Sequence, residues 1–230
     1  MGTFYGPTTL TIPNTDGLVL YLDSTIKRSY PGSGSILYDV SGNQLNATVN
    51  SSYINSTALL SGASASTATT SILNTDQHSV FFMIRFEPNG TYPNGYSGSW
   101  EKIFSYNAGG SDRAPSVWRY PSQRLLHWRF DPSNTGSDFG LVGISTEFSL
   151  NTWYYVGVTK NGATANSYVN GNLVVTNTVS NPKTSGNAAI ILFESYTLSS
   201  AKINSIQVYN RPLSTAEVQQ NYNIISNRFV

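Results

Sequence analysis

The 230-residue sequence contains no cysteine, so it can form neither a disulfide framework nor a zinc–thiolate site. Charged residues make up 11% of the chain and the net charge is +1, whereas about 25% of an average soluble domain is charged. Without a clustered basic face, the chain is not expected to bind nucleic acid. No apolar run approaches the ~20 residues of a membrane-spanning helix, so we expect no membrane partner.

The first residues also lack the pattern of a secretory signal. Met1 is followed by GTFYGPTTLTIPN, which has neither a basic segment nor an apolar one. Four Asn-X-Ser/Thr sequences occur, and we attribute them to the richness of the chain in these residues rather than to glycosylation. Residues 1–15 precede the first strong strand pattern, and we predict an N-terminal arm or edge segment there, followed by a single domain over 16–230.

Short segments of alternating apolar and polar residues dominate the chain. The segments with this pattern are 18–23, 79–88, 102–107, 125–131, 153–161, 165–178, 188–194 and 201–210. They are rich in β-branched and aromatic residues and are bounded by Gly, Pro, Asn or Ser, which predicts strands. Asn170-Gly171 supplies two residues that tolerate positive φ, so it predicts a two-residue hairpin turn. No alternation of strands with helices appears. The sequence therefore predicts an all-β fold, a two-sheet antiparallel β-sandwich of the jelly-roll type.

One short helix is predicted at the C-terminus, in RPLSTAEVQQNY. Ser214 fits the N-cap and Glu217 lies three residues later, which together form a capping box. Leu213 and Val218 occupy the two positions of a hydrophobic staple. Apolar residues recur at helical spacing in Val218, Tyr222 and Ile225. We expect this face to dock on one side of the sandwich.

Three blocks of the sequence carry a family resemblance. DGLVLYLDSTIKRSYPGSGSILYDVSGNQLNATV (16–49), NTWYYVGVTKNGATANSYVNGNLV (151–174) and INSIQVYNRPLSTAEVQQNYN (203–223) stand near the start, middle and end. Together they resemble laminin-G-like jelly-roll domains of the concanavalin A-like lectin/glucanase superfamily. The first and last blocks are similar to copies found in tailed-phage structural proteins. The resemblance implies a concanavalin A-like jelly roll over 16–230.

The chain departs from the family at acidic positions. Where members often carry F-D-G-x-D-D-Y, it has LLSGASASTATTSIL (59–73), and Asn204 replaces a common Asp. Calcium needs six to eight oxygen ligands. The weak candidates for such ligands are Asp112, Asp131 and Asp138. Turn hydrogen bonding explains these residues as well, so we expect no metal or other cofactor, with Ca²⁺ as the alternative.

The glucanase branch cleaves sugars with carboxylates on one strand, in the pattern E-x-D-x-x-E, and this chain lacks that motif. Its glutamates are isolated in sequence: Glu87, Glu101, Glu147, Glu194 and Glu217. His78 and His127 are the two histidines, and we interpret both as packing residues. We therefore expect a protein that is not an enzyme, with glycan hydrolysis by carboxylates from distant strands as a less favoured alternative.

Sugar binding is the most specific function that the residues suggest, because an aromatic face packs against the apolar side of a sugar ring. The segment 92–130 is rich in aromatic and arginine residues and in loops. The candidates are Tyr96, Trp100, Tyr106, Arg113, Trp118, Tyr120 and Arg129. The alternative is that these residues fill the core or a subunit interface, as we expect for Trp128 and Trp153.

The resemblance implies a non-enzymatic phage protein on the virion surface, either a head decoration protein or a component of the tail or fibre. Its expected partners are other virion proteins, copies of itself and a host cell-surface glycan. The alternative function is a stand-alone carbohydrate-binding lectin.

Overall fold

The computed structural model describes residues 14–60, 64–88, 91, 93–96, 98–107, 115–130, 139–141, 147–179, 186–193 and 201–229. The strands before residue 130 are β1 (Leu18–Asp23), β2 (Ile36–Leu37), β3 (Ala47–Thr48), β4 (Leu59–Leu60), β5 (Ala65–Thr67), β6 (Gln77–Phe86), β7 (Glu101–Asn107), β8 (Ser116–Arg119) and β9 (Leu126–Arg129). Those after it are β10 (Phe139–Leu141), β11 (Trp153–Asn161), β12 (Thr164–Val169), β13 (Asn172–Thr178), β14 (Ala189–Leu192) and β15 (Ala201–Tyr209). A 3-10 turn, η1 (Ser51–Tyr53), and the helix α1 (Thr215–Ser226) complete these elements.

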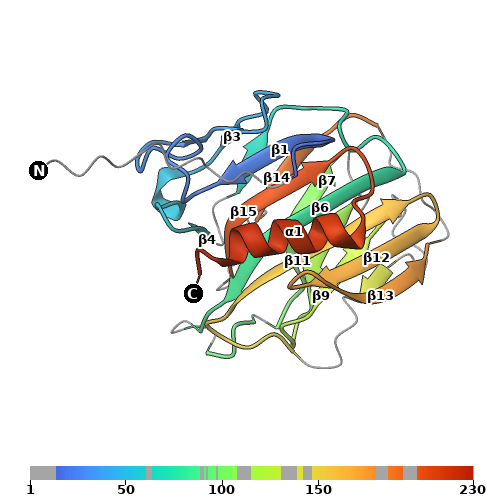
Figure 1. Cartoon of the computed structure of the whole chain (residues 1–230). Helices are drawn as coiled ribbons and strands as arrows, with labels where there is room; N and C mark the ends of the chain where they lie inside the picture. The colour runs from blue at the N-terminus through green and yellow to red at the C-terminus, as the bar shows by residue number, and fades with distance from the viewer. Residues whose placement is uncertain are drawn as a thin grey trace, which may run out of the picture.

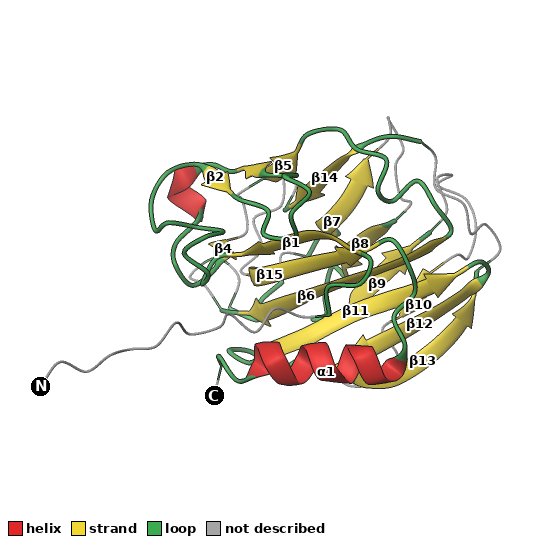
Figure 2. Ribbon diagram, turned by 45° about the horizontal axis from the view of Figure 1, so that its top comes forward, coloured by secondary structure: helices red, strands yellow, loops and turns green. Residues whose placement is uncertain are grey.

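The strands form two antiparallel sheets that pack face to face (Figures 1 and 2). The first sheet has the order β1-β15-β6-β11-β12-β13, with β4 also paired to β15. The second has the order β10-β9-β8-β7-β14-β5-β3-β2. The predicted all-β sandwich with one C-terminal helix is therefore confirmed.

The main core lies between the sheets and is rich in aromatic rings. Phe82 of β6 stacks on Trp128 of β9 with centroids 6.0 Å apart, and Phe86 stacks on Phe148 at 5.7 Å. Trp128 is fully buried, as the sequence predicted. The central strand β6 reads as an almost continuous apolar run because both of its faces are covered.

The helix α1 covers the outer face of the first sheet, where Figure 1 shows it crossing β15, β6 and β11. A second apolar cluster fills this space, and its ring-bearing members include Tyr21, Phe81, Tyr155, Tyr168 and Tyr209. Val218 and Ile225 of α1 are fully buried in it. Polar tips inside the cluster are satisfied, since Asn221 donates to the Tyr209 hydroxyl at 2.9 Å.

The predicted helix start is confirmed in detail. The Ser214 side chain accepts from the Glu217 N–H, and the Glu217 carboxylate accepts from the Ser214 N–H, which completes the capping box. Leu213 and Val218 are both buried, as a hydrophobic staple requires. The predicted hairpin turn is confirmed too, because Asn170 and Gly171 have φ of 50° and 80°.

Several short strands were not predicted. They include β2, β3, β4 and β10, and β8, which we had interpreted as loop. Trp153, predicted in the core, instead lies half-buried on the outer face of the first sheet, where its ring meets Phe229 at 4.9 Å. Its position follows from register, because β11 pairs with β6 and Trp153 lies opposite the half-buried Arg85.

Of the predicted N-terminal arm, only residues 14 and 15 are described. Asn14 contacts α1, where its backbone N–H donates to Asn221 at 2.8 Å and its side-chain amide donates to Glu217 at 2.7 Å. The rest of the arm, residues 1–13, lies outside the described residues. None of the helices described here is both long enough and apolar enough to cross a membrane.

Candidate functional site

A buried ion pair fixes the register of β7 and β8 at the edge where the candidate aromatics lie. Glu101 and Arg119 are cross-strand partners. Their side chains are 2% and 0% exposed, with one N–O distance of 2.5 Å and a second of 3.1 Å. A buried charge is tolerated only when it is paired in this way. The pair therefore locks the first residue of β7 to the last residue of β8.

Two aromatic residues flank this pair in the sequence and meet beside it. Trp100 precedes Glu101, and Tyr120 follows Arg119, and their ring centroids lie 4.6 Å apart. His127 of β9 joins them, at 5.3 Å from the Trp100 ring and 5.6 Å from that of Tyr120. Trp100 is 44% exposed, which is unusual for so large an apolar side chain.

Trp118 extends this group of rings along β8. It pairs with His127 across the β8–β9 hairpin, so the two side chains stand on the same face of the sheet. The Lys102 Nζ atom lies 4.9 Å from the centre of the Trp118 ring, and the indole N–H donates to the Ser116 hydroxyl at 2.9 Å. We call Trp100, Trp118, Tyr120 and His127 the aromatic patch.

The aromatic patch combines ring faces with polar tips. The Tyr120 hydroxyl lies 3.4 Å from His127 Nδ1. Burial raises the pKa of Tyr120, so its hydroxyl keeps its proton at neutral pH. Exposed rings beside such hydroxyl and imidazole groups can stack on the apolar face of a sugar and bond its hydroxyls. The patch therefore provides the chemistry of a carbohydrate-binding surface.

Three other sequence candidates lie elsewhere in the structure. Tyr96 is half-buried and approaches Arg119, with 6.0 Å from the guanidinium carbon to the ring centre. Tyr106 is fully buried, and its hydroxyl donates to the Thr70 carbonyl at 2.6 Å. Arg129 is 8% exposed. Tyr106 and Arg129 thus lie in the interior rather than on the exposed surface.

The remaining candidates lie outside the described residues. They are Arg113, proposed for sugar binding, and Asp112, Asp131 and Asp138, the weak candidates for calcium. In the part of the chain that the structure describes, no group of three or more His, Asp or Glu side chains is placed to hold a metal ion.

The described glutamates are each engaged by a basic side chain. Glu147 pairs with Arg124 at 2.7 Å. Glu87 lies between Arg85 and Lys202, at 2.9 and 2.6 Å. Glu101 is inaccessible beneath the aromatic patch. Each of these carboxylates is thus held in an ion pair.

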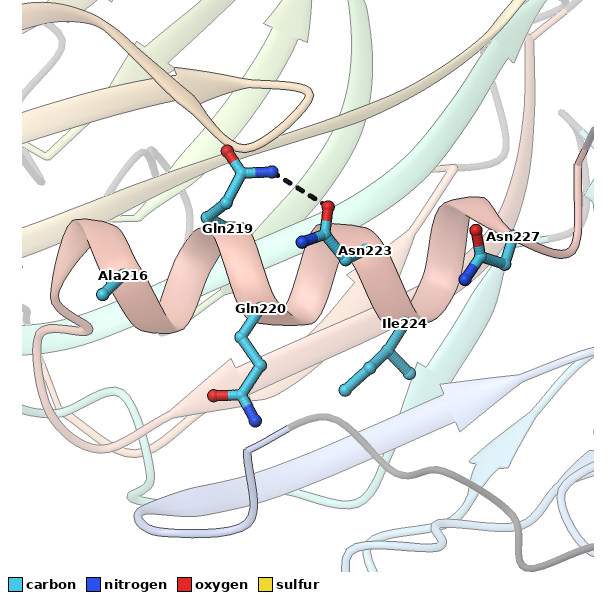
Figure 3. A pocket seen from close by; sticks show the side chains of 6 residues that line it. All are labelled: Ala216, Gln219, Gln220, Asn223, Ile224 and Asn227. Carbon is cyan, nitrogen blue, oxygen red and sulfur yellow. Dashed lines mark hydrogen bonds between the residues drawn. The ribbon is translucent and has the colours of Figure 1, made fainter.

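A shallow hollow follows the outward face of α1 (Figure 3). Gln219 and Asn223 are joined by a hydrogen bond of 3.0 Å, and Gln220 and Ile224 point to the other side of the helix (Figure 3). The residues that line this hollow are neither charged nor aromatic. The aromatic patch is the better candidate because it offers rings for stacking.

His127 is the member of the patch that sequence reasoning missed. Its place beside Trp128 in an alternating segment, with no acidic partner evident in the sequence, predicts a packing residue. Once Ser116–Arg119 and Leu126–Arg129 are seen as a hairpin, Trp118 falls opposite His127. The sequence did carry a signal for this hairpin: two short alternating segments stand on either side of the turn sequence PSQR.

Comparison with solved structures reveals the same fold in larger proteins. A Trypanosoma rangeli sialidase in complex with sialic acid aligns over 94% of this chain and 34% of its own, with 14% identity and a TM-score of 0.66. The botulinum neurotoxin serotype D binding domain aligns over 91% of this chain and 52% of its own, with 18% identity and a TM-score of 0.67. The chain thus spans about a third of the sialidase and half of the toxin domain.

No curated protein sequence matches the chain. A family profile does match, over residues 61–219, and it is described as the concanavalin A-like lectin/glucanases superfamily. The match covers more than half of the 230 residues. It includes the ion pair, the aromatic patch and most of the first sheet. The chain therefore belongs to the concanavalin A-like lectin/glucanases superfamily.

Proposed function

We propose that this chain is a non-enzymatic adhesion domain that binds a host-cell glycan through the aromatic patch. The observation that carries the proposal is the exposed Trp100 ring, held 4.6 Å from Tyr120 and 5.3 Å from His127. A ring that is 44% exposed but fixed by neighbours presents a flat apolar surface with little entropy left to lose on binding. A pyranose ring has a matching apolar face.

A neutral sugar fits this patch better than a charged one. The Glu101 and Arg119 charges are paired and buried, and Lys102 is 6% exposed, beside the Trp118 ring. Recognition would therefore rest on stacking and on hydrogen bonds from Tyr120 and His127. The fold is shared with a sialidase that was solved with sialic acid, which supports the class of ligand without identifying the sugar.

The described carboxylates favour binding without turnover. Glycoside hydrolysis needs two carboxyl groups about 5–10 Å apart across the scissile bond. Glu101, the carboxylate next to Trp100 in the sequence, is buried and paired with Arg119. The other described glutamates, Glu87, Glu147 and Glu217, are each paired with Arg or Lys.

We place this adhesion domain on the surface of a phage virion, on the head or in the tail or fibre. The support is the resemblance of 16–49 and 203–223 to tailed-phage structural proteins. A surface solvated mainly by Ser, Thr, Asn and Gly, with 11% charged residues, suits packing against other virion proteins and copies of itself. Immunogold labelling of particles with an antibody to the chain should decorate their surface, and unlabelled particles would overturn this placement.

Glycan binding is tested with the purified chain on an array of bacterial envelope glycans. We expect binding that falls at least tenfold in Trp100→Ala. The matched control is Tyr38→Ala, which removes a ring of similar exposure, 42%, remote from the patch in sequence. An array without signal, or equal losses in the two variants, would overturn the proposal.

A further inference from the structure

A second pocket lies on the opposite side of the sandwich, beneath the C-terminal end of α1. It has a volume of about 330 Å³, at the lower end of the range for small-molecule sites. Its walls come from β6, β11, α1 and the residues that flank β11 and α1, and they include Arg85, Asn151, Trp153, Tyr222, Ser226 and Phe229. We propose that this helix-end pocket binds an acidic sugar unit, a pyranose ring that carries a carboxylate.

The pocket has an aromatic wall. The Trp153 and Phe229 rings lie 4.9 Å apart at 43° to each other. Tyr222 of α1 lies nearby, 6.2 Å from the buried Tyr155. Trp153, Tyr222 and Phe229 are all half-buried, so each side chain keeps part of its surface exposed. Such a wall accepts the apolar face of a sugar ring.

Polar groups on the walls are free to bind a ligand. Among the described residues, no hydrogen bond engages the Trp153 indole N–H or the hydroxyls of Tyr222 and Ser226. The exposed Asn151 is held at φ 59° by a 2.7 Å bond from its N–H to the Phe86 carbonyl, which fixes it at the rim. These polar groups line the same pocket as the aromatic wall and can form hydrogen bonds with sugar hydroxyls.

Arg85 lines the pocket and, together with its neighbours Lys202 and Glu87, indicates an anionic ligand. Arg85 and Lys202 are cross-strand partners on β6 and β15, and both contact the same carboxylate, that of Glu87. Two cations with one anion leave one positive charge. Arg85 reaches Glu87 through Nε, so its two terminal nitrogens remain for a bidentate contact with a carboxylate. Because Arg85 also pairs in register with Trp153, charge and ring stand side by side.

This inference does not depend on the proposed function. The helix-end pocket lies on the outer face of the first sheet, whereas the aromatic patch belongs to the second. The patch lacks an accessible unpaired charge and is proposed for a neutral sugar, so the two sites would take different parts of a glycan. Either one can fail without the other.

The test compares two ligands that differ only at C6, methyl β-D-glucuronide and methyl β-D-glucoside, by titration calorimetry. We expect the glucuronide to bind at least tenfold more tightly at low salt, and its affinity to fall as salt is raised. Equal affinities, or no binding of the glucuronide, would overturn the proposal.

Variants assign the site. Arg85→Gln should weaken glucuronide binding at least tenfold, while Arg28→Gln, which removes an exposed arginine elsewhere, should not. Glu87→Gln frees Arg85 from its partner and should tighten binding several-fold, so the proposal remains testable even if Arg85→Gln unfolds. Binding that survives Arg85→Gln but is lost in Trp100→Ala would place the glucuronide at the aromatic patch and overturn this inference.

Discussion

An arginine–glutamate pair lies at the start of α1, and another lies at the C-terminal end of β8. The first pair is partly exposed to solvent and the second is buried. Arg211 and Glu217 meet at 2.6 Å with about a quarter of each side chain exposed. Glu101 and Arg119 meet at 2.5 Å with almost no exposure. If the exposed pair separates, water solvates both charges. If the buried pair is broken, nothing solvates the remaining charge. Similar chemistry thus supports a helix cap at one place and the aromatic patch, the candidate site for a ligand, at the other.

The largest effect is expected from breaking the buried pair. Arg119→Met leaves the Glu101 carboxylate uncompensated in the interior, so the free energy of unfolding should fall by about 3–5 kcal/mol. Urea unfolding followed by circular dichroism measures the change. Glycan binding by the aromatic patch should fall as well, because Trp100 and Tyr120 adjoin the two members of the pair in the sequence.

The exposed pair supplies the matched control. Arg211→Met should cost about 1 kcal/mol or less. The double variant Glu101→Leu/Arg119→Met should recover most of the lost stability, since two apolar side chains can replace a buried pair. Equal costs for Arg119→Met and Arg211→Met would show that burial does not distinguish the pairs.

The next effect concerns the packing of α1. Ile225 is fully buried in the cluster between the helix and the first sheet. Ile225→Ala should lower the free energy of unfolding by about 3 kcal/mol because it leaves a cavity. The helix-end pocket should also lose affinity for the glucuronide, since Tyr222 and Ser226 lie on the same helix. An Ile225→Val variant should cost about 1 kcal/mol and keep the affinity.

The helix could be predicted almost completely from sequence because its determinants are local. Leu213, Ser214, Glu217 and Val218 lie within six consecutive positions, so spacing alone identifies the capping box and the staple. The longer strands were recognisable for a similar reason, since alternation over six or more residues is a local signal. The hairpin at Asn170-Gly171 belongs to this class too.

The candidate sites depend on pairing between distant strands, which spacing does not reveal. Trp100 and Tyr120 become neighbours because Glu101 pairs with Arg119, eighteen positions apart along the chain. The sequence pattern predicts an exposed ring at Tyr106, but its side chain on β7 points into the interior. Trp153 looked like core, yet it lies on the face that α1 covers only in part. Side-chain direction in a sheet follows register, and a bulge in β7 between Lys102 and Phe104 shifts it.

Removal of the N-cap of α1 should have a smaller effect on stability. Ser214→Ala removes the acceptor for the Glu217 N–H and should cost about 0.5–2 kcal/mol. Thermal unfolding measures the loss. Gln220→Ala, on the exposed face of the same helix, should change stability by less than about 0.5 kcal/mol. Equal melting temperatures for wild type and Ser214→Ala would show that the capping box does not stabilise α1.

The last effect is the pH dependence of the exposed pair. The hydrogen bond from Arg211 lowers the pKa of Glu217 to about 2, from 4.5. A carboxyl whose pKa is lower in the folded state stabilises the protein above the unfolded pKa, and this stability is lost as pH falls towards the folded value. The difference in melting temperature between wild type and Glu217→Gln should therefore be constant above pH 5 and shrink between pH 4.5 and 2. Because the pair is partly exposed, 1 M NaCl should reduce the same difference at pH 7. A difference that is independent of both pH and salt would mean that Glu217 acts through its uncharged cap contacts, and the contrast with the buried pair would then rest on geometry rather than on charge.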